Sequence, residues 1–102
     1  MSCDTTIYRS RTTFTGSGHE HTVLRTPVLE HQGWGLGETL AGEFEIANGQ
    51  TIEVETFNLI EVLTSYIQTI EDEDILHELN EGLTEIEGIA RDGFDVAINI
   101  DW

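Results

Sequence analysis

The sequence predicts an α+β fold, a single two-layer domain spanning residues 1–102, in which two helices cover one face of an antiparallel sheet. Three observations lead to this class. The length of 102 residues fits one domain, alternating apolar and polar residues near both ends predict strands, and apolar residues at helical spacing predict two consecutive helices. The expected order is β-β-(β)-β-β-α-α-β, where the bracket marks a segment that fits a strand or a loop, so the sheet would contain about four or five strands.

The first two strands form a predicted hairpin. Residues 5–15, TTIYRSRTTFT, are rich in β-branched and aromatic residues, which favour a strand. A second strand is expected at residues 21–29, ended near Pro27 because proline fits only an edge or the end of a strand. The glycine-rich turn at residues 16–18 joins the two strands, so the pair is antiparallel.

Residues 31–42, HQGWGLGETLAG, contain four glycines and Trp34. This composition favours a bent or bulged strand, or a loop. A phosphate-binding P-loop is excluded because the chain has no lysine. Trp34 either covers the core or lies exposed as an anchor for a partner.

Residues 43–57 form the second predicted hairpin. A three-residue loop at 47–49, with Gly49 left-handed, keeps polar and apolar faces separate because it pairs Phe44 with Ile52. In that register one face carries Glu43, Glu45, Glu53 and Glu55. Like charges placed opposite one another are destabilising, so this acidic face calls for a functional explanation.

Two helices follow the hairpin. Asn58 and Glu61 fit a capping box at the start of a helix over residues 59–70. The second helix, residues 71–93, has apolar residues at helical spacing and ends at a glycine. Its acidic residues Asp74, Glu78, Glu81 and Glu85 are expected to face solvent.

Residues 94–102, FDVAINIDW, alternate as a strand. The side chains expected to face the core are Phe94, Val96, Ile98, Ile100 and Trp102. A strand this apolar on one face belongs in the sheet.

Charge separates the two parts of the chain. Twenty acidic residues face four arginines, giving a net charge of −16, and residues 30–102 hold 18 of the acids against Arg91 alone. Such a chain is repelled by DNA, RNA and anionic membranes, which excludes direct binding to them.

No transmembrane run and no signal-peptide pattern is visible, so we expect a cytoplasmic protein. The single cysteine, Cys3, excludes an internal disulfide and is interpreted as a terminal thiol without a role.

Few residues suggest catalysis or metal binding. His19 and His21 point the same way in a strand and, with His31 or a glutamate as a third ligand, are the candidates for a zinc or nickel site. No H-E-x-x-H or C-x-x-C motif supports such a site, and no G-x-S-x-G motif supports a nucleophilic enzyme. We therefore expect no enzymatic activity and no cofactor, and we expect the histidines to be solvated.

The acidic surface remains, and it suggests charge mimicry. Carboxylates about 5–7 Å apart on a helix or strand approximate the spacing of phosphates in a nucleic acid. The hypothesis is a non-enzymatic inhibitor that occupies the basic nucleic-acid-binding surface of a partner protein. Small acidic inhibitors that phages make against CRISPR or restriction enzymes have this general size and charge. The analogy is one of size and charge only, since no motif of this chain matches such a family. The expected partner-binding residues are Glu43, Glu45, Glu53, Glu55, Asp74, Glu78, Glu81 and Glu85, with Trp34 as an apolar anchor.

Two alternatives explain the same sequence differently. The first is an acidic interaction or assembly domain adapted to a high-salt cytoplasm, with Trp102 and the edge of the last strand as its apolar contact. The second is a small metal-binding protein that uses His19, His21 and His31.

Overall fold

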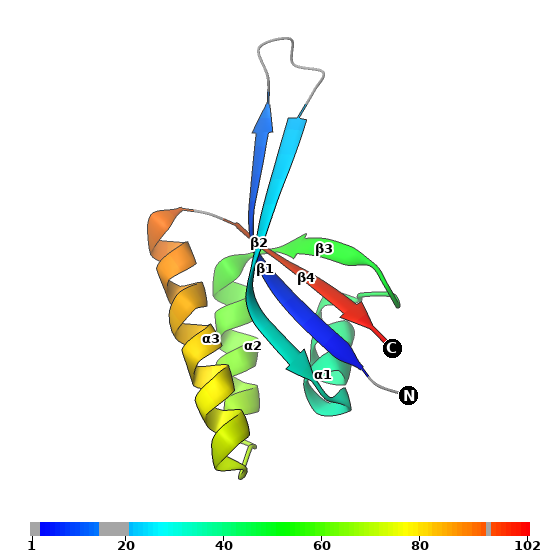
Figure 1. Cartoon of the computed structure of the whole chain (residues 1–102), viewed down its shortest axis with the longest axis vertical. Coiled ribbons are helices and arrows are strands. Elements are labelled where there is room, and N and C mark those ends of the chain that lie inside the picture. The colour runs from blue at the N-terminus through cyan, green and yellow to red at the C-terminus, as the bar shows by residue number, and fades with distance from the viewer. Residues whose placement is uncertain (1–2, 15–20, 94) are drawn as a thin grey trace.

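The structure is a computed structural model that describes the backbone of residues 3–14, 21–93 and 95–102, and the side chains of 3–10, 26–93 and 95–102. Within these residues there are seven elements: β1 (Asp4–Phe14), β2 (His21–Gln32), α1 (Trp34–Phe44), β3 (Thr51–Val54), α2 (Thr56–Ile67), α3 (Glu73–Asp92) and β4 (Asp95–Asp101). The strands form one antiparallel sheet in the order β2-β1-β4-β3 (Figure 1). The predicted α+β class with a four-stranded antiparallel sheet is confirmed.

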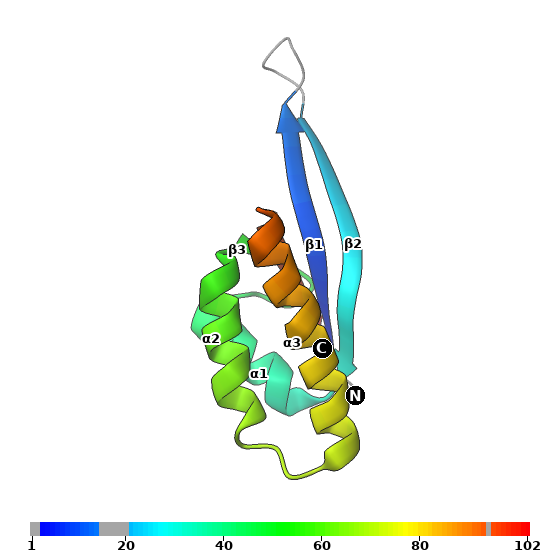
Figure 2. The same cartoon turned by 90° about the vertical axis from the view of Figure 1, so that its left-hand side faces the viewer.

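The core lies between the sheet and the helices. Ile7 of β1 pairs with Leu29 of β2 on one side and Ile98 of β4 on the other, and Ile98 pairs with Ile52 of β3. Because paired residues share a face of the sheet, this row is apolar across all four strands. The helices cover that face alone, as Figure 2 shows. Their fully buried contributions are Leu36, Leu40, Leu59, Leu63, Leu79 and Ile86.

The last strand, β4, lies in the middle of the sheet between β1 and β3. This position explains its alternating sequence, since Val96, Ile98 and Ile100 are all fully buried as predicted. Trp102 is 38% exposed, so its predicted place in the core is wrong. It follows the final pair of β4, and its backbone N–H donates to Oδ1 of Asn48 at 2.9 Å. Phe94 lies outside the described residues.

The N-terminal hairpin extends beyond the rest of the sheet. β4 accompanies β1 only as far as Ser10, whereas the β1–β2 register continues to Phe14 opposite His21 (Figure 1). β2 is longer than predicted and passes through Pro27. Proline is accepted there because β2 is an edge strand and the register shifts next to it, between the pairs of Ile7 and Tyr8.

A third helix, α1, replaces the loop or bulged strand predicted at residues 31–42 and the first strand of the hairpin predicted at 43–57. Leu36 and Leu40 are spaced four residues apart and are both completely buried, so their burial outweighs the weak helix propensity of the glycines. Phe44 therefore does not pair with Ile52. Gly49 does adopt the predicted left-handed conformation (φ 76°), within the connection from α1 to β3.

The two later helices agree with their predictions to different degrees. α3 is capped at its start by Asp72, whose carboxylate accepts hydrogen bonds from the N–H groups of Asp74 (2.9 Å) and Ile75 (3.1 Å), and at its end by left-handed Gly93. α2 starts three residues earlier than predicted, with Glu55 at the N-cap position. The capping box predicted at Asn58 is therefore wrong, and the Asn58 amide donates back to Glu55 instead, at 3.4 Å.

Candidate functional site

An acidic stripe runs along one face of α3 and consists of Asp74, Glu78, Glu81 and Glu85. These residues are spaced by four, three and four positions, which places them on one face of a helix. With a rise of 1.5 Å per residue, the stripe is about 16 Å long and its carboxylates follow one another every 4.5–6 Å along the axis. The structure thus brings together the four predicted residues of this helix.

The orientation of the stripe follows from what α3 buries. Leu79 and Ile86 are completely buried against the sheet and α2, whereas Asp74, Glu81 and Glu85 are exposed. The carboxylates of Asp74, Glu81 and Glu85 are consequently accessible to solvent because another face of the same helix is held in the core.

Two carboxylates of the stripe have histidine neighbours. Oε1 of Glu78 lies 3.3 Å from Nδ1 of His31 on β2, and the His31 side chain is only 8% exposed. Glu78 therefore also connects α3 to the edge of the sheet. Oε1 of Glu81 lies 3.0 Å from Nε2 of His77, where both side chains are exposed to solvent.

The four glutamates of the predicted hairpin do not form one acidic face. Glu43 lies in the last turn of α1, Glu45 is the left-handed C-cap residue of that helix, and Glu55 is the N-cap residue of α2. Glu53 is the only one of them on a strand, where it accepts a hydrogen bond from Oγ of Ser10 at 3.1 Å. Their predicted arrangement is wrong because α1 takes the place of the first hairpin strand.

A different set of acids lies on the sheet face that the helices leave uncovered. The register puts Asp4 opposite Asp101, Ser10 opposite Asp95, and Thr6 opposite both Glu30 and Asn99. The exposed carboxylates of this open face are Asp4, Glu30, Glu53, Asp95 and Asp101. Alternation in β4 predicts two of them, whereas Asp4 and Glu30 join the face only through long-range strand pairing.

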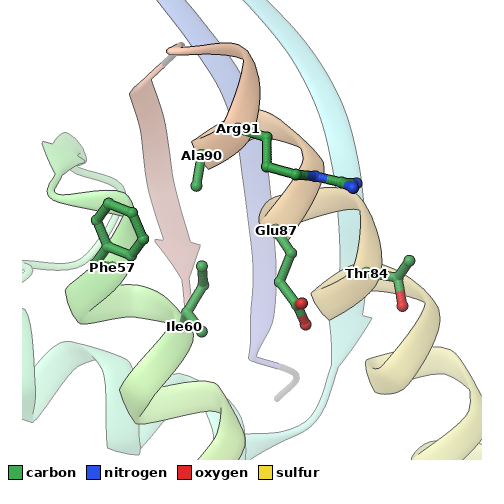
Figure 3. Close-up of a pocket in the computed structure, with 6 residues that line it drawn as sticks. All are labelled: Phe57, Ile60, Thr84, Glu87, Ala90 and Arg91. Carbon is green, nitrogen blue, oxygen red and sulfur yellow. The ribbon is translucent and has the colours of Figure 1, made fainter.

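A groove between α2 and α3 was not anticipated from the sequence. It has a volume of about 560 Å³, and it is lined by Phe57, Ile60, Thr84, Glu87, Ala90 and Arg91 (Figure 3). Phe57 is 65% exposed, more than either Trp34 (39%) or Trp102 (38%). Phe57 falls at the end of a predicted strand, so its position in the first turn of α2 became evident only from the structure.

The described side chains of the histidines and of Cys3 give no sign of a metal or catalytic centre. His19 and the side chain of His21 lie outside the described residues, while His31 is engaged with Glu78. Within the part of the chain that the structure describes, no three metal-binding side chains gather. Cys3 is a free cysteine, but it is 1% exposed in the core, so its interpretation as a stray thiol in a mobile terminus is wrong. Burial, followed by the nearby charges of Asp4 and Glu38, raises its pKa.

Comparisons with protein-family models, curated proteins and solved structures found no significant match. Among the described helices, none has the length and apolar character needed to cross a membrane.

Proposed function

We propose that this chain is a non-enzymatic acidic protein that binds the basic nucleic-acid-binding surface of a partner protein, acts by charge mimicry, and works in the cytoplasm. Phage inhibitors of CRISPR or restriction enzymes exemplify this kind of action. The observation that carries the proposal is the acidic stripe of α3, which presents four carboxylates in line on a rigid element. A helix fixes the spacing of these charges before binding, so little ordering entropy opposes the contact.

The charge of the whole molecule supports the same partner chemistry. A net charge of −16 repels nucleic acids and attracts clusters of arginine and lysine over distances of about a Debye length, roughly 8 Å at physiological salt. The open sheet face adds five exposed carboxylates on a second side. A binding role also fits Cys3, because a buried thiol with a raised pKa is a poor nucleophile.

The test is a competition experiment with matched charge reversals. The stripe variant carries Asp74→Lys, Glu81→Lys and Glu85→Lys, and it keeps Glu78 because that residue contacts His31. The control variant carries Glu38→Lys, Glu61→Lys and Glu71→Lys, which are exposed residues outside the stripe and the open sheet face and change the net charge equally. Fluorescence anisotropy would report the displacement of labelled DNA or guide RNA from a panel of restriction and CRISPR effector proteins.

We expect the wild type to displace nucleic acid from at least one panel member. The stripe variant should be weaker by about tenfold or more, since three exposed ion pairs together contribute on the order of 1.5 kcal/mol. The control variant should lose much less. Equal loss in both variants would show that only total charge matters, and no displacement by the wild type would contradict the proposal.

A further inference from the structure

The α2–α3 groove combines an exposed aromatic ring with a hollow beside it. Phe57 and Ile60 are one helical turn apart on α2, and Ala90 of α3 points toward them (Figure 3). The side chain of Arg91 extends away from Phe57 in the same view, so the part of the groove nearest the ring is apolar. A 65% exposed phenylalanine next to an unfilled apolar hollow has the form of a site for a large apolar side chain.

The groove and the acidic stripe lie on different faces of α3. Thr84 and Glu87 line the groove, and Glu85, the next residue after Thr84, belongs to the stripe. Successive helical residues are about 100° apart, so Glu85 points away from the groove, and the stripe offers a partner a second, separate contact. The lining itself contains one acidic residue, Glu87, and one basic residue, Arg91.

These charges indicate the occupant. A second copy of the chain would bring another net charge of −16 against the same helix, which opposes self-association. A basic segment is attracted by the net charge of −16 and, at the groove, by Glu87, and its apolar side gains by covering Phe57 and Ile60.

We propose that the α2–α3 groove docks a basic amphipathic segment of the partner protein, with a large apolar side chain inserted beside Phe57 and Ala90 and with a lysine or arginine facing Glu87. The inference rests on the proposed function for the basic charge of the partner and adds to it an apolar anchor. Binding then has two separable components: the charge contacts weaken with salt, whereas the apolar contact does not.

The experiment uses the full chain and a synthetic helical peptide of lysine, alanine and leucine with one central tryptophan. NMR titration of the isotope-labelled protein would give the Kd and the residues whose signals shift. Three protein variants are compared with the wild type: Phe57→Ala, the conservative Phe57→Leu, and Trp102→Ala, which removes another exposed aromatic outside the groove. A second peptide replaces leucine and tryptophan by glutamine at the same charge, and a third replaces lysine by glutamine.

We expect signals of Ile60 and Ala90 to shift and Phe57→Ala to raise the Kd about tenfold, as truncation of a central aromatic contact does. Phe57→Leu should recover most of the affinity, and Trp102→Ala should leave the Kd unchanged. The glutamine-for-leucine peptide should bind the wild type as weakly as the original peptide binds Phe57→Ala.

Three outcomes would overturn the inference. If shifts are confined to the stripe and Phe57→Ala has no effect, the groove is not used, while the proposed function stands. If the lysine-free peptide binds in the groove as tightly as the original, the site is not selective for a basic partner, and the proposed function loses support as well. If the wild type binds no peptide, or fills its own groove in a concentration-dependent dimer, the assigned occupant is wrong.

Discussion

Gly82 and Gly88 both lie inside α3, yet their surroundings differ. A Cβ atom at Gly82 would lie 2.8 Å from Cδ1, 3.0 Å from Cδ2 and 3.1 Å from Cγ of Leu29, so the whole leucine side chain would have to move. Leu29 is 95% buried, which leaves it little room. A Cβ atom at Gly88 would meet only the end of the Arg91 side chain, at 3.6 Å. Gly82 is therefore a point of close approach between α3 and β2, and Gly88 is not.

This contrast predicts opposite effects of the same substitution. Gly88→Ala should raise the free energy of unfolding by about 0.5–1 kcal/mol, because alanine is the better helix former. Gly82→Ala should lower it by about 1 kcal/mol, since overpacking outweighs the same gain in propensity. Urea denaturation of both variants measures the difference, and Leu29→Val should relieve part of the loss when combined with Gly82→Ala. Stabilisation by Gly82→Ala alone would show that Leu29 moves freely.

Among the elements, α3 and β4 are predictable from the sequence because local pattern and tertiary environment agree. The apolar stripe of α3 faces the core, Asp72 and Gly93 mark its ends, and β4 alternates because only one of its faces meets the helices. α1 is not predictable in this way. Its helical state depends on the burial of Leu36 and Leu40 by residues distant in the chain, a contribution that local propensity does not contain.

The candidate site is likewise predictable from the sequence only in part. The stripe follows from helical periodicity alone, so its four residues are identified from the sequence. The groove requires two further facts, namely that α2 begins at Thr56, which places Phe57 on a helix, and that α2 packs beside α3. The open sheet face requires the strand register, which unites Asp4 with Asp101 across 97 positions of sequence.

The end of α1 offers a prediction at the scale of an element. Glu45 adopts φ 54° and ψ 52° at the C-cap of α1, a conformation that glycine adopts without strain. Glu45→Gly should therefore raise the free energy of unfolding by about 1 kcal/mol, the approximate cost of a left-handed residue with a side chain. Glu43→Gly is the matched control, since it removes the same charge inside the helix and should destabilise by about as much. Chemical denaturation measures the stability of both variants. If both are more stable than the wild type, the cause is the lost negative charge and not the left-handed conformation of Glu45.

Over the whole molecule, the two parts of the chain carry opposite charge. Arg9, Arg11 and Arg25 belong to β1 and β2, while the remaining elements carry Arg91 as their only arginine and most of the acids. The folded body therefore holds many like charges close together, at a cost that depends on salt. Hydrophobic burial between the sheet and three helices opposes this repulsion and does not need counterions.

Thermal unfolding at low salt and in molar KCl measures this balance. We expect a cooperative transition well above room temperature at low salt, and a Tm higher by about 5 °C or more in KCl, because screening reduces the repulsion among the acids. The stripe variant, with its smaller net charge, should show a smaller salt effect. If the chain folds without added salt, its many acidic residues are not an adaptation to a high-salt environment. This outcome agrees with a role of these residues in partner binding. A chain that is unfolded at low salt and rescued by KCl would instead support the acidic assembly domain of a high-salt cytoplasm, and charge mimicry would lose its main support.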